Sequence, residues 1–105
     1  MRAIVAEKIS KPEDLTLVDL PTPEPERGQI RIDVKAAAQN VADTLIEGHE
    51  YQVRPEFPCS PGFEVAGVVS AVWLAVTDFR VGDRVIATMD YGAYREQVIV
   101  EDFLA

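Results

Sequence analysis

The clearest pattern in the chain is a strict alternation of apolar and polar residues near its first third. The apolar positions are Ile30, Ile32, Val34 and Ala36, and the residues between them are Arg31, Asp33 and Lys35. Successive side chains of a strand point to opposite faces of a sheet, so this stretch predicts a strand with one buried and one solvated face.

Further strands are predicted on both sides of this one. Residues 65–74 form a long valine-rich run, in which Gly67 indicates a bulge or the close approach of another backbone. The pair Gly82-Asp83 is a turn signal before the next strand. The other predicted strands cover residues 3–9, a short stretch within 15–20, residues 84–89, and the end of "YGAYREQVIV".

The stretch "NVADTLIEGH", residues 40–49, changes to a helical period. Asn40 suits the N-cap, Asp43 lies in the first turn where a negative charge is favourable, and Gly48 suits the position after the helix. The apolar residues on one side are Val41, Leu45 and Ile46. We therefore expect one short helix here.

Six or seven strands, regular turn signals and one short helix favour a small β-barrel or an irregular sandwich over a parallel α/β fold. The proline-rich stretch "LPTPEPERG", residues 20–28, cannot lie inside a central strand or helix. It predicts a stiff, extended connection within one domain.

Composition narrows the range of partners and locations. A net charge of −8 over 105 residues argues against nucleic acid and anionic membranes. The single cysteine, Cys59, excludes an internal disulfide and a cysteine-rich metal cluster, and we expect it to be a packed small residue. No apolar run reaches the roughly 20 residues of a membrane helix, and the N-terminus has no signal-peptide pattern. We expect a cytoplasmic protein without nucleic acid or membrane partners.

Several motifs in order resemble one known family. The quoted stretches are "VKAAAQNVADTLIEG", "FPCSPGFEVAGVVSAV", "VTDFRVGDRVIA" and "YGAYREQVIV". They are similar to the N-terminal, GroES-like domain of medium-chain dehydrogenases/reductases, in the zinc-independent, zeta-crystallin-like quinone oxidoreductase branch. The resemblance covers residues 1 to about 100. It implies a mainly β fold, a partly open β-barrel with one or two short helices.

The resemblance also implies a reaction. The barrel forms the substrate side of a cleft, a Rossmann-type domain holds NADPH, and hydride passes from the nicotinamide to a quinone or an enone. No G-x-G-x-x-G occurs in residues 1–105, so the chain resembles the GroES-like domain without the nucleotide-binding domain. We expect this chain to be inactive without that domain, and NADPH to bind only in the complete enzyme.

The same mapping argues against zinc. In the zinc alcohol dehydrogenases a cysteine stands at the position of Asn40 and a histidine at the position of Phe63. Zinc needs thiolate, imidazole or carboxylate ligands, and a catalytic zinc needs three of them from the protein. We therefore predict no metal site in this chain.

The residues of the cleft follow from the resemblance. Asn40 is assigned to the nicotinamide end of the cofactor, although a helix N-cap alone explains it equally well. Leu45, Tyr51 and Phe63 are assigned to the substrate cleft, with Tyr51 equally explained as an aromatic cover of the barrel. Asp43 and Glu64 are expected to hold local structure near the cleft, and no catalytic residue is firmly assigned.

Two departures from the family pattern stand out. Some quinone reductases carry a tyrosine where this chain has Leu45, so a polar contact with the substrate is lost. Trp73 and Leu74 occupy a turn that usually contains glycine, and we expect a reshaped loop there, with an apolar surface.

Other functions stay open on the sequence alone. The chain could be a free-standing GroES-like module that binds a partner or forms a homo-oligomer through exposed apolar surface, without catalysis. It could also be one subunit of a split enzyme whose nucleotide domain is a separate chain.

Overall fold

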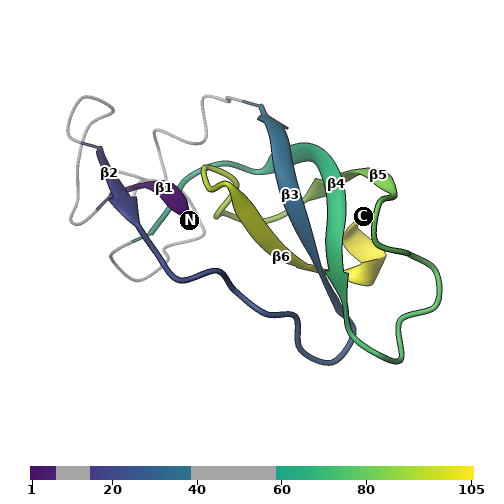
Figure 1. The fold of residues 1–105 in the computed structure, drawn as a ribbon. Coiled ribbons are helices and arrows are strands. Elements are labelled where there is room, and N and C mark those ends of the chain that lie inside the picture. The colour runs from purple at the N-terminus through teal and green to yellow at the C-terminus, as the bar shows by residue number, and fades with distance from the viewer. Residues whose placement is uncertain (7–14, 39–58) are drawn as a thin grey trace.

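The computed structural model describes residues 1–6, 15–38 and 59–105. Six strands in this part of the chain form two antiparallel sheets (Figure 1). The small sheet pairs β1 (Arg2–Val5) with β2 (Thr16–Asp19). The larger sheet has the order β5-β4-β3-β6, and its strands are β3 (Gln29–Ala37), β4 (Glu64–Val72), β5 (Arg84–Thr88) and β6 (Gln97–Glu101). A short 3-10 turn, η2 (Asp102–Leu104), follows β6.

The alternating stretch forms β3, at the centre of the larger sheet, as its pattern predicts. Ile30 and Ile32 are completely buried, whereas the alternate residues Arg31 and Asp33 are partly exposed on the other face. The ladder with β4 shifts register between Arg31 and Ile32 and again between Val34 and Ala36. These irregularities bend the strand, so the sheet curves instead of lying flat.

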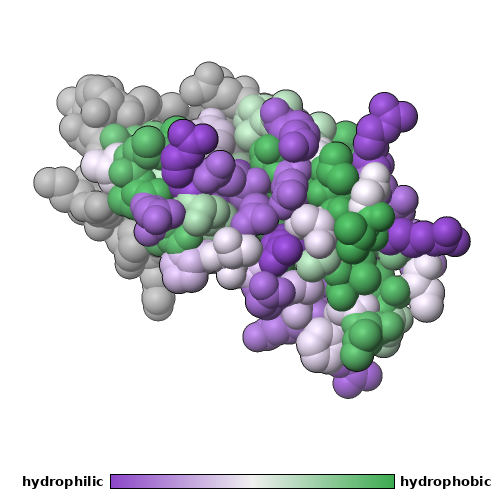
Figure 2. Space-filling model, viewed as in Figure 1, coloured by the Kyte–Doolittle hydropathy of each residue, from purple (hydrophilic) through white to green (hydrophobic). Residues whose placement is uncertain are grey.

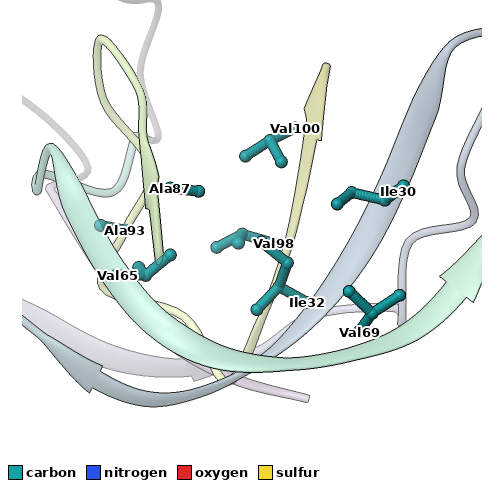
Figure 3. Close-up of a cluster of buried hydrophobic side chains, with 8 residues drawn as sticks. All are labelled: Ile30, Ile32, Val65, Val69, Ala87, Ala93, Val98 and Val100. Carbon is teal, nitrogen blue, oxygen red and sulfur yellow. The ribbon is translucent and has the colours of Figure 1, made fainter. Parts of the chain in front are cut away.

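The hydrophobic core lies in the hollow of this curved sheet (Figure 3). The two long strands β3 and β4 curve beneath the cluster, and the side chains from β6 and β5 point in from the other sides. Its members are Ile30, Ile32, Val65, Val69, Ala87, Ala93, Val98 and Val100. All are small or branched aliphatic residues, which suits a narrow barrel interior.

The proline-rich connection, residues 20–28, runs between β2 and β3 without regular secondary structure. Arg31 holds it against the polar face of the larger sheet: its Nη1 donates to the carbonyl oxygen of Pro23 at 3.2 Å and lies 3.1 Å from Oε1 of Glu24. Its Nε donates to Ser70 Oγ at 2.9 Å. The predicted stiff connection is therefore tied down by one arginine.

The predicted fold class is confirmed: the structure is mainly β, and its sheets do not close into a complete barrel. Element ends differ slightly. The first strand starts at Arg2, and its predicted end at Ile9 lies outside the described residues. The fourth strand ends at Val72 and not at Leu74, because a turn begins at Trp73, whose carbonyl accepts a bond from the Val76 amide at 2.9 Å.

The predicted helix over residues 40–48 lies outside the described residues. The reshaped loop at Trp73 and Leu74 is present as a turn, with the Leu74 side chain fully exposed. Within residues 1–6, 15–38 and 59–105, no helix is long and apolar enough to span a bilayer.

Candidate functional site

The stretch that leads into β4, residues 59–63, is held along its whole backbone. Each of its five carbonyl oxygens accepts a hydrogen bond from the main-chain amide of another segment. The N···O distances are 2.7 to 3.3 Å. In the order of the acceptors from Cys59 to Phe63, the donors are the amides of Ala6, Gly92, Tyr94, Ala93 and Met89. This stretch is therefore fixed between the end of β1 and the connection from β5 to β6.

Gly62 makes the tight fit of this stretch possible. Its φ is +104°, and a Cβ atom there would lie 2.5 Å from the Cβ of Ala93 and 2.8 Å from the ring of Tyr94. Both the left-handed backbone and the lack of space require glycine. Pro61-Gly62 thus delivers Phe63 and Glu64 to the start of β4 in one fixed path.

Buried polar contacts accompany these main-chain bonds. Ser60 is completely buried, and its Oγ accepts a hydrogen bond from Arg95 Nε at 3.1 Å. Cys59 is also buried, which agrees with the expectation of a packed small residue.

An apolar cavity of about 670 Å³ opens at one end of the larger sheet. It is lined where β3 ends, where β4 begins and where β5 ends, and by the last two residues of the chain. Most of its wall consists of small or aliphatic side chains, and Glu64 and Thr88 supply its polar groups. Its size lies in the usual range for small-molecule sites.

A second cavity, of about 830 Å³, differs in character. It lies over β4 and β5, and charged residues line much of it, among them Lys35, Asp83 and Arg84. A flat, uncharged ligand favours an apolar wall with few polar groups, so the cavity beside Glu64 is the better candidate site.

The structure locates two of the six residues assigned to the site. Glu64 is exposed at the start of β4 and lines the apolar cavity, and Phe63, half-buried, directly precedes it. Asn40, Asp43, Leu45 and Tyr51 lie outside the described residues.

A main-chain hydrogen bond extends the pairing of β3 and β4 by one residue beyond the end of β3. The Ala38 amide donates to the Glu64 carbonyl at 3.0 Å. The carboxylate of Glu64 makes no hydrogen bond or ion pair with another described residue, although we expected Glu64 to hold local structure. It can therefore interact with a ligand or with the undescribed segment.

Two carboxyl groups outside the apolar cavity have pKa values that hydrogen bonds from nearby residues lower. The hydrogen bond from the Gln97 amide, 2.8 Å long, lowers the pKa of the Asp33 carboxyl, with smaller contributions from Ser70, Arg31 and Lys35. Main-chain and side-chain bonds from Arg2 lower the pKa of Glu96. Neither carboxyl lines the apolar cavity, so neither is a candidate for its chemistry.

No group of three histidine, cysteine, aspartate or glutamate side chains in the described ranges could hold a metal ion. Phe63 has no ligand atom. Among the described residues, no lysine or arginine lines the apolar cavity, so this wall suits an uncharged group better than the phosphates of a dinucleotide.

Sequence reasoning missed the partners of the fixed stretch. Ser60, Tyr94 and Arg95 did not enter the predicted site, although they hold or contact residues 59–63. No local pattern in the sequence pairs residue 95 with residue 60. Thr88 was placed in a strand, and only the sheet order brings it beside Glu64.

Comparison with known proteins identifies the family to which this chain belongs. Residues 26–103 match the model of the alcohol dehydrogenase GroES-like domain. A quinone oxidoreductase from Lama guanicoe is 39% identical over 104 residues, which cover 97% of this chain and 32% of that protein. The chain thus spans about a quarter to a third of the length of the curated relatives that it matches.

Two solved structures are similar over nearly the whole chain. The human synaptic vesicle membrane protein VAT-1 homolog-like protein matches with a TM-score of 0.91 and 35% identity, covering 96% of this chain and 33% of the other. The Escherichia coli quinone oxidoreductase complexed with NADPH matches with a TM-score of 0.92 and 30% identity, covering 99% of this chain and 32% of the other. The chain belongs to the alcohol dehydrogenase GroES-like domain family, in the quinone oxidoreductase branch of the medium-chain dehydrogenases/reductases.

Proposed function

We propose that this chain is the substrate-side domain of an NADPH-dependent quinone or enone oxidoreductase. The observation that carries the proposal is the apolar cavity at the start of β4, which directly follows the fixed stretch, residues 59–63. Relatives named quinone oxidoreductases, and the NADPH complex of the E. coli structure, support the reaction class and the cofactor.

The cavity suits a quinone by its shape and polarity. Ala36, Ala37 and Ala38 make one wall with little side-chain bulk, so a flat ring has room. The Thr88 hydroxyl can donate a hydrogen bond to a quinone carbonyl oxygen, and this bond strengthens as the oxygen gains negative charge. The Glu64 carboxylate at the wall disfavours anionic substrates.

When NADPH is bound, its nicotinamide supplies the hydride. The described wall of the apolar cavity has no basic side chain that could bind its phosphates. We therefore propose that a nucleotide-binding domain holds the cofactor, that Asn40 contacts the nicotinamide, and that the domain described here binds the quinone with Leu45, Tyr51 and Phe63. The reaction needs no zinc, and a cytoplasmic location stays a prediction.

A quinone titration of the chain tests the proposal. Duroquinone is a suitable probe, because its ring is fully substituted and thiols therefore do not add to it. We expect it to shift the amide NMR signals of Ala37, Val65 and Thr88. Shifts confined to the far end of the sheet, or none at millimolar probe, would contradict the proposed site.

Two matched variants sharpen this test. Ala36→Leu puts a larger side chain into the cavity wall at an exposed position and should abolish the shifts. Ala71→Leu lies near the other end of β4, opposite Arg31, and should leave them unchanged. Equal effects of the two variants would mean that the cavity is not the binding site.

A second function, binding without catalysis, is supported by a different feature. Hydrophobic residues gather along one side of the molecule, over β4, β5 and their connection, while polar residues cover β3 (Figure 2). The most exposed large apolar side chains on that side are Leu74, Ile86 and Val81. A discrete oligomer in sedimentation, together with failure to bind duroquinone, would favour this binding module over the oxidoreductase.

A further inference from the structure

Ser60 is the one polar residue that is completely buried in the described part of the chain. A buried hydroxyl without a partner is costly, because it loses its hydrogen bonds to water. Arg95 supplies the partner through its Nε, 3.1 Å from Ser60 Oγ. The two residues are 35 positions apart, so the bond joins separate segments.

Arg95 stands where three segments meet. Its own backbone bridges to Ala3 in β1, and it lies shortly before β6. Its neighbour Tyr94 donates its amide to Pro61 and accepts the Ile4 amide at 2.9 Å. The side chain of Arg95 thus adds a directed, side-chain bond to the main-chain bonds that already fix residues 59–63.

Packing alone does not require this pair. An alanine at position 60 and an aliphatic residue at position 95 would remove the buried hydroxyl and the partly desolvated guanidinium. Replacement of buried charged pairs by apolar residues is often neutral or stabilising in proteins. A polar pair gives one preferred orientation instead, because its hydrogen bond is directional. Ser60 lies three residues before Phe63, in the stretch that leads to the cavity wall at Glu64.

We propose that Arg95 is a positioning residue that acts through the Ser60 hydroxyl to fix Phe63 and Glu64 beside the apolar cavity, and so sets the affinity for the quinone. This inference rests on the proposed oxidoreductase function. Arg95 does not line that cavity, so it acts on the substrate only through the stretch that it holds.

Steady-state kinetics of the complete gene product tests the role. We expect Arg95→Met and Ser60→Ala each to raise KM for duroquinone roughly tenfold, since small misplacements of a site are costly, and to leave KM for NADPH unchanged. The double variant should be no worse than either single variant, because both remove one bond. Arg27→Met, at an exposed arginine in the proline-rich connection, is the matched control and should behave as the wild type.

Arg95→Lys separates positioning from folding. Lysine keeps a donor and a charge but not the planar geometry, so we expect partial rescue, with a KM between those of the wild type and Arg95→Met. Unchanged KM values in folded Arg95→Met and Ser60→Ala would overturn the proposal. So would additive effects in the double variant, or an equal rise of KM for NADPH.

NMR of the 105-residue chain distinguishes this proposal from the function on which it rests. Arg95→Met and Ser60→Ala should shift the ring signals of Phe63 and speed amide exchange at Gly92, Ala93 and Tyr94, which donate to the fixed stretch. Shifted signals in a protein that reduces no quinone would leave the positioning intact and reject the reaction. Unchanged Phe63 signals would reject the positioning whatever the activity.

Discussion

A side chain at Gly67 would place its Cβ atom 2.1 Å from the main-chain carbonyl oxygen of Asp33. No real Cβ atom approaches a backbone oxygen so closely, so β4 can lie against β3 at this point only because residue 67 is glycine. The contact falls between the two register shifts of β3, where the sheet bends around the core. The curvature that shapes the barrel therefore depends on one missing side chain.

Gly67→Ala should destabilise the fold by about 3 kcal/mol, because the added methyl group meets backbone that cannot rotate away. Urea unfolding followed by circular dichroism measures the change. Gly82→Ala is the control: its φ is +98° but no atom lies within 4 Å of the added Cβ, so only backbone strain of about 1 kcal/mol is expected. Equal losses in the two variants would contradict the close contact.

Ile32→Ala should cost about 3 to 4 kcal/mol in the free energy of unfolding, because Ile32 is completely buried in the core cluster and its removal leaves a cavity. The same denaturation experiment measures it. Leu74→Ala removes a fully exposed side chain and should change the stability by less than about 0.5 kcal/mol. A large loss at Leu74 would mean that the turn after β4 packs against something in solution.

Asp33 should make the fold sensitive to acid. The bond from Gln97 lowers the folded-state pKa of Asp33 below its unfolded value of about 3.9. The ionised form therefore contributes stability above the unfolded pKa, and this contribution is lost as the pH falls through the folded pKa. We expect Gln97→Met to flatten the decline of the unfolding free energy as the pH falls below about 4.

Asp33→Asn provides the second arm of this test. An amide does not titrate, so the part of the acid sensitivity that comes from residue 33 should disappear. Parallel stability curves for the wild type, Gln97→Met and Asp33→Asn would show that the bond does not stabilise the ionised form.

Chelation should have no effect on quinone reduction by the complete gene product. Phe63 provides no ligand atom, and the described part of the chain contains no cluster that could bind a metal. Activity before and after dialysis against EDTA measures this. Loss of activity that returns with added zinc would reject the metal-free account.

Local patterns predicted most of the strands. The alternation from Ile30 to Ala36 predicted the strand, but its buried face is limited to Ile30 and Ile32, since Val34 is half-buried and Ala36 is exposed. Gly67 interrupts a valine-rich run, which predicted a bulge or a close backbone, and the structure shows both. The predicted strand ran two residues past the end of β4, because Trp73 and Leu74 continue the apolar run although they begin a turn.

The site was less accessible to sequence reasoning. The bond between Ser60 and Arg95 joins positions 35 residues apart, and neither residue carries a local signal for the other. Thr88 adjoins Glu64 only through the pairing of β4 with β5. The roles of Asn40, Asp43, Leu45 and Tyr51 stay predictions, because they rest on the family resemblance and lie outside the described residues.

The most direct test of the account is NADPH oxidation by the complete gene product, followed by the loss of NADPH absorbance, with duroquinone as acceptor. We predict steady turnover that depends on both NADPH and duroquinone. The Ala36→Leu variant should lose this turnover, and the Ala71→Leu variant should keep it. Turnover with simple alcohols and NADP⁺ in place of the quinone reaction, or no turnover with any quinone, would contradict it.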